Sequence, residues 1–238
     1  MQRVFISLPY VIGTLFELSP QATRHVQVLR SQPGHRLELF DGQGNSSIAQ
    51  IERMGKHTVE VSLIEVLPSQ PKPICYFHAV VGMPANERMD WLIEKATELG
   101  VSRITPVMSQ RSVVRLSGDR AEKRVAHWYG IAQSACAQSG RNWLPIIDLP
   151  VSLTDFMTRF GSQENSVNVL LTTSIWGRNW REFWSNAPSY FTFVNGPEGG
   201  FSAEEEQFVI DQGFLPVSLG SMVLRSETAT IAVLAQLL

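Results

Sequence analysis

The stretch YFTFVNGPEGGFS, residues 190–202, runs from an apolar segment into a loop rich in glycine. The apolar part predicts a buried strand, and the loop marks the point where that strand ends. Similar apolar segments occupy residues 167–173 and 215–219, and helical segments separate the three. Strands that alternate with helices predict a parallel sheet covered on both faces, which places the second part of the chain in the α/β class.

The segments upstream of this stretch extend the same pattern. Residues 74–82 and 104–108 read as further apolar strands, and residues 119–138 as a helix. Between the two strands, residues 86–99 carry apolar side chains at helical spacing, and Gly100 ends that helix. A last helix is expected from residue 226 to the C-terminus.

The segment LPSQPKP, residues 67–73, separates two regions of different character. Its three prolines can continue neither a helix nor a central strand. The region before it has short alternating segments, at residues 3–8, 36–40, 47–54 and 57–66, with one helix-like stretch at 20–29. We therefore predict a small β-barrel domain at residues 1–70 and an α/β domain at residues 74–238.

The composition excludes several classes of protein. With 44% hydrophobic and 18% charged residues, the chain is typical of a globular protein. No segment approaches the roughly 18 consecutive apolar residues of a membrane span, and the first twenty residues show no cleavage site. Two distant cysteines and five histidines without ligand spacing predict a cytoplasmic protein with no membrane association and no metal site.

Basic residues cluster locally although the net charge is only −2. Such a cluster can bind phosphate groups whatever the overall charge. A solvated face with internal salt bridges is the alternative interpretation. The basic residues of the cluster are Arg103, Arg111, Arg115, Arg120, Lys123 and Arg124, opposed by Asp119 and Glu122.

Three loops follow three successive apolar strands, at residues 172–174, 195–201 and 220–225. Ligands of open parallel sheets bind beyond the carboxyl ends of the strands, so these loops predict one pocket. Their glycines permit close backbone approach to a ligand. A tight turn with Ser202 capping the next helix is the simpler alternative for the 195–201 segment. That segment matches neither a Walker loop nor a dinucleotide-binding fingerprint.

Two of these segments together resemble a known signature. NGPEGGFS (residues 195–202) and LGSMVLRSETA (residues 219–229) resemble the C-terminal motifs of SPOUT methyltransferases, closest to the bacterial 16S rRNA uridine-N3 methyltransferase family. Ser221-Met222 inside the second motif is a departure that could alter pocket contacts. Upstream segments agree with that family: Arg24-His25 with Val28-Leu29-Arg30, Lys95 with Glu98-Leu99-Gly100-Val101, Arg111-Ser112, and Gln138-Ser139 with Arg141 and Pro145.

The resemblance implies a fold and a cofactor. The fold would be an N-terminal PUA-like barrel that binds RNA, followed by a SPOUT domain whose chain threads a trefoil knot. The cofactor would be S-adenosyl-L-methionine. Leu219 and Leu224 can also be interpreted as residues of the apolar core. The two interpretations are compatible, because adenine also needs apolar walls. The implied cofactor pocket consists of Leu171, Thr172, Gly196, Gly200, Val217, Leu219, Gly220 and Leu224.

Two residues are candidates for catalysis. Arg225 could stabilise negative charge on the uracil, with pairing to Glu227 or to a neighbouring carboxylate as its structural alternative. Glu198 could orient the base or accept a proton if burial raises its pKa, with capping of backbone amides as the alternative. His25 is expected to be a partly buried histidine without a catalytic role. The candidates for contact with 16S rRNA, or with the small ribosomal subunit that contains it, are Arg24, Arg30, Arg111 and Arg141.

The last helix is apolar on nearly all sides, with Ile231, Val233, Leu234, Leu237 and Leu238. These residues cannot share one face, so we expect a homodimer, with cover from within the same chain as the alternative. Two other functions stay open at this stage: a ribose 2′-O-methyltransferase of the same fold, and a non-catalytic protein that binds RNA during ribosome assembly.

Overall fold

The computed structural model describes residues 1–238 except 8–10, 29, 162–163, 174–177, 180–187 and 237–238. The chain divides into two compact units. Unit 1 consists of Met1–Lys72 together with Gln133–Leu144, and unit 2 of Pro73–Ala132 together with Pro145–Leu238. None of the described helices is long and apolar enough to cross a membrane. The same described residues contain no group of three or more His, Cys, Asp or Glu side chains placed to hold a metal ion.

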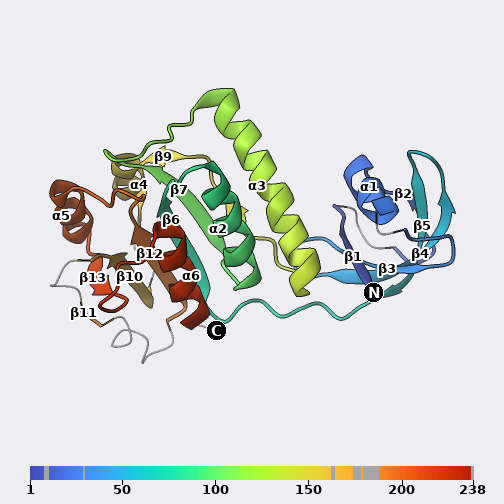
Figure 1. The fold of residues 1–238 in the computed structure, drawn as a ribbon. Coiled ribbons are helices and arrows are strands. Elements are labelled where there is room, and N and C mark those ends of the chain that lie inside the picture. Colours follow the sequence, from blue (N-terminus) through green and yellow to red (C-terminus); the bar gives the residue numbers. More distant parts are fainter. Residues whose placement is uncertain (8–10, 29, 162–163, 174–177, 180–187, 237–238) are drawn as a thin grey trace. The chain divides into compact units, whose positions relative to one another are not determined.

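Unit 1 is built on a five-stranded sheet of order β1-β3-β4-β5-β2 (Figure 1). β1 pairs with β3 in parallel, and the other pairs are antiparallel. In β5, Val59, Val61 and Leu63 are buried at alternate positions, which is why this segment forms a strand with one core face. The elements of the unit are β1 (Gln2–Phe5), β2 (Leu15–Glu17), α1 (Pro20–Val28), β3 (Arg36–Phe40), β4 (Ser46–Met54) and β5 (Val59–Val66).

The end of helix α3 (Gly118–Ser139) and the residues after it pack with unit 1. Arg3 organises this contact, since its guanidinium donates hydrogen bonds to the carbonyl of Cys136 at 2.6 Å and to the side chain of Asn142. The same guanidinium pairs with Glu38 at 3.2 Å and lies 4.7 Å from the centre of the Phe40 ring. Residues 133–144, which sequence analysis placed in the second domain, therefore complete the first unit.

Unit 2 contains an eight-stranded sheet of order β11-β13-β10-β12-β6-β7-β8, with β9 beside β7. All its strand pairs within this path are parallel, which confirms the predicted sheet. Its strands are β6 (Tyr76–Gly82), β7 (Arg103–Met108), β8 (Ile146–Ile147), β9 (Val151–Ser152), β10 (Ser166–Leu171), β11 (Arg178–Asn179), β12 (Tyr190–Asn195) and β13 (Leu215–Ser218).

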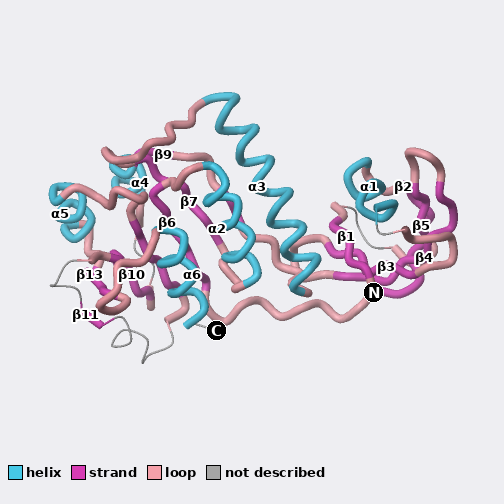
Figure 2. Tube along the Cα trace, in the orientation of Figure 1, coloured by secondary structure: helices cyan, strands magenta, loops and turns pink. Residues whose placement is uncertain are grey.

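Helices α2 (Asn86–Glu98), α4 (Leu153–Arg159), α5 (Ala203–Asp211) and α6 (Ser226–Gln236) complete unit 2 (Figure 2). α2 packs against α6, and α6 packs on β6 and β12. A separate apolar core joins Val80 and Val194 of the sheet to Met157 of α4 and Val209 of α5. Helices thus cover the sheet through two sets of apolar contacts, as expected for parallel strands that are buried on both sides.

The longer predicted strands and helices are all present, with bounds shifted by a few residues. The short strands β2, β8, β9 and β11 were not predicted, because two or three residues carry no measurable periodicity. The trefoil knot stays a prediction.

Candidate active site

A pocket of about 520 Å³ opens where β10, β12 and β13 end. These strands are neighbours in the sheet and run parallel, so the loops that follow them meet at one edge. The pocket walls are residues 171–173, 195–201 and 218–226, with Arg88, Arg111, Glu206 and Ala229. The predicted convergence of three loops is therefore observed, apart from Ser174, which lies outside the described residues.

Glycines let the 195–201 loop fold tightly beside the sheet. A Cβ atom on Gly196 would lie 2.8 Å from the backbone carbon of Gly200 and from the nitrogen of Phe201. A Cβ atom on Gly82, at the end of β6, would lie 2.3 Å from the nitrogen of Pro197. Real Cβ atoms do not approach backbone this closely, so larger side chains would deform the pocket wall.

Arg88 of α2 connects the 195–201 loop to α6. Its guanidinium lies 3.0 Å from Glu198 Oε1, and its Nε lies 3.9 Å from Glu227 Oε1. The Glu227 side chain is only 9% exposed, and its second oxygen accepts no hydrogen bond within the described part of the chain. Arg88 thus holds two carboxylates, one of which is buried and depends on it.

Glu198 is held as an ionised group. Partial burial acts to raise its pKa, but the hydrogen bond from the Ala85 amide at 3.0 Å and the charge of Arg88 outweigh burial, so the pKa is lowered. The condition for Glu198 as a proton acceptor, a raised pKa, is not met. The alternative expected from sequence, capping of a backbone amide, is the observed arrangement.

Buried polar contacts fix the start of α6 against the end of β12. Asn195 Nδ2 donates a hydrogen bond to Ser226 Oγ at 2.8 Å, and Thr230 Oγ1 donates to Asn195 Oδ1 at 3.2 Å. Also in the pocket wall, Thr172 Oγ1 donates to Glu206 at 3.2 Å. Because these groups are paired with one another, the walls of the pocket are set before any ligand enters.

Two arginines differ in their freedom at this pocket. Arg111 donates hydrogen bonds to the carbonyl oxygens of Gly199 at 2.8 Å and Phe201 at 3.2 Å, so it braces the loop. Arg225 is exposed at the pocket wall and, among the described residues, forms no ion pair. Glu227, its expected alternative partner, pairs with Arg88 instead. Arg225 is therefore available to a substrate.

Of the eight expected cofactor residues, seven line the pocket, and Val217 does not. Val217 is fully buried in β13, and its carbonyl accepts a hydrogen bond from the Thr172 amide at 3.0 Å. The resemblance implied it as a backbone contact to the cofactor; its side chain packs in the core, and its role in cofactor binding stays a prediction.

The other arginines expected to contact RNA lie in unit 1. Arg24 and Arg30 are exposed, whereas Arg141 is half-buried and burial lowers its pKa. Arg88, Asn195, Glu206 and Ser226 line the pocket without having been candidates. Asn195 and Ser226 lie inside the two quoted motifs, but their contact is not local. The partners in the three contacts described are 31, 34 and 110 positions apart in the chain, so local sequence does not reveal them.

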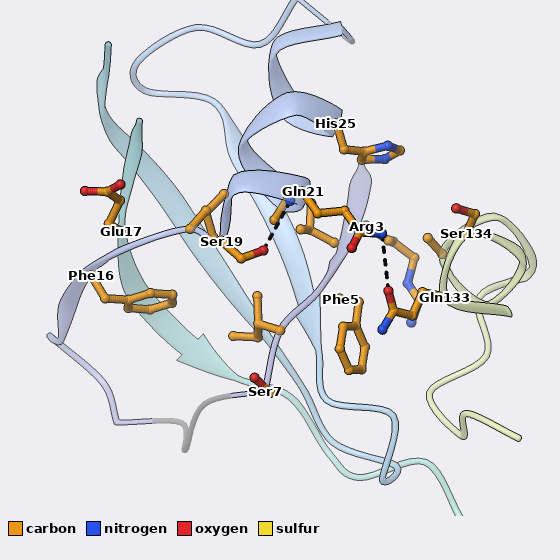
Figure 3. Close-up of a pocket in the computed structure, with 15 residues that line it drawn as sticks. Arg3, Phe5, Ser7, Phe16, Glu17, Ser19, Gln21, His25, Gln133 and Ser134 are labelled. Carbon is orange, nitrogen blue, oxygen red and sulfur yellow. Dashed lines mark hydrogen bonds between the residues drawn. The ribbon is translucent and has the colours of Figure 1, made fainter. Parts of the chain in front are cut away.

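Unit 1 has a smaller pocket of about 220 Å³, between β1, α1 and the end of α3 (Figure 3). Phe5, Phe16 and Ser7 lie around it, and Gln21 hydrogen-bonds Gln133 across it at 3.4 Å. His25 is at its edge and is exposed, which corrects the expectation of a partly buried side chain.

Comparison with known proteins decides the family. Residues 70–238 match the family described as RNA methyltransferase domain, and residues 18–64 match the RNA methyltransferase PUA domain. The chain belongs to the RNA methyltransferase family. The SPOUT methyltransferase resemblance and the PUA-like module expected from sequence are thereby confirmed.

Relatives of this RNA methyltransferase align over nearly its whole length. It is 30% identical over 240 residues to ribosomal RNA small subunit methyltransferase E of Buchnera aphidicola subsp. Schizaphis graminum, covering 99% of this chain and 94% of the relative. A Legionella pneumophila methyltransferase solved with bound S-adenosylmethionine is 36% identical, with a TM-score of 0.92 and coverage of 99% and 96%. Ribosomal RNA small subunit methyltransferase E of Neisseria gonorrhoeae, also solved with S-adenosylmethionine, is 30% identical, with a TM-score of 0.90 and the same coverage.

Proposed function

We propose that this RNA methyltransferase transfers a methyl group from S-adenosylmethionine to N3 of a uridine in 16S rRNA. The observation that carries the proposal is the glycine-walled pocket at the carboxyl edge of the sheet, with the exposed Arg225 at its wall. The names of the relatives and the cofactor in the two solved structures support the substrate class and the methyl donor.

The pocket suits that cofactor. Its volume of about 520 Å³ lies in the range of small-molecule sites. Leu171, Leu219 and Leu224 offer apolar surface to adenine, and the glycines leave backbone groups accessible to polar atoms. The Glu206 carboxylate, already held by Thr172, complements a cationic ligand. When bound, S-adenosylmethionine supplies an electrophilic methyl group on a sulfonium.

The residues of this chain position the base and stabilise charge. N3 of uridine is hidden in a base pair, so the target must be unpaired before it reaches the pocket. Loss of the N3 proton to solvent leaves negative charge on the uracil oxygens, which the exposed guanidinium of Arg225 can stabilise. Glu198, being ionised and bound to Arg88, shapes the loop and leaves Arg225 as the catalytic candidate.

Both units carry arginines proposed to contact RNA. Arg24 and Arg30 are exposed on the unit that matches the PUA domain, and Arg111 lies at the pocket. Arginines at such places position an RNA through its phosphates. Arg141 is the weakest of the proposed contacts, because its side chain is half-buried.

We also propose a homodimer that works in the cytoplasm, where its ribosomal substrate is found. Val233 and Leu234 of α6 are covered within one chain, which leaves Ile231 half-buried, and Leu237 and Leu238 lie outside the described residues. The support comes instead from the pocket loop, where Met222 and Val223 are 78% and 81% exposed. A second copy would remove this apolar surface from water.

Nucleoside mass spectrometry of 16S rRNA tests the function. RNA from cells that lack this protein should contain one N3-methyluridine fewer, and the purified protein with S-adenosylmethionine should restore it. Restoration should fail with Arg225→Gln. A change in a ribose-methylated nucleoside would instead establish the 2′-O activity, and unchanged rRNA in both experiments would contradict the proposal.

A further inference from the structure

Polar side chains form two rows on one face of the unit 2 sheet, at the amino ends of its strands. Thr192 of β12 lies between Asn168 of β10 and His78 of β6 in the strand register, and His78 is level with Arg103 of β7. One row further out, Tyr190 lies level with Ser166 and Tyr76. Residues two apart on a strand share a face, so both rows lie on the same side. Apolar side chains are the rule on buried parallel strands, which makes these rows an exception.

The rows line a recess of about 700 Å³ that is separate from the cofactor pocket. No residue lines both, and they lie at opposite ends of the same strands. Phe156 and Arg159 of α4, with Phe160, provide the facing wall. Every lining residue belongs to unit 2. The methyl-transfer pocket therefore gives no reason for this recess to be polar.

The floor of the recess is a fixed chain of hydrogen bonds. Arg103 binds Asp148 through two contacts of 2.7 and 2.9 Å, and the Thr105 hydroxyl donates to the same carboxylate. His78 Nε2 lies 2.7 Å from Thr105 Oγ1. Because the Thr105 proton is directed to Asp148, Nε2 must carry the proton shared with Thr105, which leaves Nδ1 as an acceptor.

The floor is also electrically balanced. Burial, assisted by the charge of Arg103, lowers the pKa of His78 to about 4, so the imidazole is neutral near pH 7. The charges of Arg103 and Asp148 cancel each other. The outer wall carries one further charge of each sign, on Arg159 and Asp155. A recess without excess charge and with fixed donors and acceptors selects a neutral polar ligand.

Aromatic rings give the shape of that ligand. Tyr76 and Tyr190 lie with ring centres 5.8 Å apart, and Tyr190 is 38% exposed at the edge of the recess. Deeper inside, Thr192 is only 5% exposed, and it is level with Asn168 on the neighbouring strand. Flat aromatic surface beside hydrogen-bonding groups is the arrangement by which proteins hold single bases.

We propose that this recess binds a neutral nucleobase, presented either by a free nucleoside or by an unpaired nucleotide of an RNA. The base stacks against Tyr190 and presents its polar edge to Thr192 and Asn168. This site does not depend on the methyl-transfer proposal, because its lining and its ligand are argued from residues outside the cofactor pocket.

Binding should be measured on the full-length protein with saturating S-adenosylhomocysteine, which keeps adenosine out of the cofactor pocket. One arm titrates the four common nucleosides by saturation-transfer NMR. The other arm crosslinks short single-stranded RNA with ultraviolet light and maps the linked peptides. Tyr190→Ala should weaken binding at least about fivefold, the usual effect of removing one stacking ring. Thr192→Val keeps the shape of the buried side chain and should also weaken binding.

The matched control is Trp91→Ala, which removes an aromatic side chain, 43% exposed, from α2 outside the recess. A saturation-transfer signal from a nucleoside that both recess variants weaken would show that the ligand is a free nucleoside. Crosslinks at residues 76 or 190 without nucleoside binding would show that the ligand is a base of an RNA. Absence of both signals, or binding that Tyr190→Ala and Thr192→Val leave unchanged, would overturn the proposal. S-adenosylhomocysteine affinity, measured in parallel, reports on the cofactor pocket alone.

Discussion

Replacement of Arg88 by alanine tests how the active-site walls are held together. The guanidinium of Arg88 binds Glu198 at 3.0 Å and approaches Glu227 at 3.9 Å. Removing it leaves Glu227, whose side chain is 9% exposed, without an ionic partner. Breaking a fully buried ion pair costs about 3–5 kcal/mol. Arg88 itself is 41% exposed and its contact with Glu227 is long. We therefore expect a smaller loss, of about 1–2 kcal/mol, in the free energy of unfolding.

A double-mutant cycle isolates this contact. Urea denaturation of Arg88→Ala, Glu227→Gln and the double variant should show the two changes to be coupled by about 1 kcal/mol, since Glu227→Gln removes the buried charge that Arg88 offsets. Calorimetry should also show weaker S-adenosylmethionine binding by Arg88→Ala, because Glu198 in the 195–201 loop loses its ion pair and retains the hydrogen bond from the Ala85 amide. Arg120→Ala, at an exposed position of α3, is the control.

Two results would contradict this role of Arg88. If the stability changes of the two single variants add to within about 0.3 kcal/mol, the residues are energetically independent. If Arg88→Ala also binds the cofactor like the unmodified protein, Arg88 does not set the shape of the pocket.

Three further predictions concern the pocket and the sheet. Gly196→Ala should lower stability by about 1–3 kcal/mol and weaken cofactor binding in calorimetry, because its Cβ would meet Gly200 and Phe201 backbone at 2.8 Å; an unchanged affinity would show that the loop relaxes freely. Arg225→Gln should reduce kcat about 100-fold or more with cofactor affinity preserved, and a normal kcat would exclude its role in charge stabilisation. Folding lowers the pKa of His78 from 6.5 to about 4, so the unfolded chain takes up its proton first as the pH falls. Stability should therefore decline by up to about 3 kcal/mol between these two pH values, and His78→Gln should remove this part of the decline in urea denaturation midpoints.

Much of the architecture follows from local sequence. The apolar runs of β6, β10 and β12 are long enough to predict buried strands, and Gly100 ends α2 where the helical spacing ends. The glycine-rich loop after β12 could be placed at a ligand site because parallel strands share their carboxyl edge. These features depend on residues close together in the chain, and periodicity reports on such features directly.

The resemblance to a known family predicted two further things, namely the family itself and most residues of the pocket. Seven of the eight expected cofactor residues line it, since the motif residues sit on the loops themselves. Val217 is the one that does not line it, because its side chain packs against the neighbours of β13, which local sequence does not specify.

Only the tertiary structure decided the contacts between distant segments. Glu198 meets Arg88 across 110 positions, and this pairing lowers the carboxyl pKa that the proton-acceptor hypothesis needed to be high. Residues 133–144 join unit 1 because Arg3 finds its partners there. The polar recess exists because four strands from separate parts of the chain align in one register. Local periodicity fixes the elements, but their neighbours are set by packing and loop closure over long distances, which no short segment of the sequence encodes.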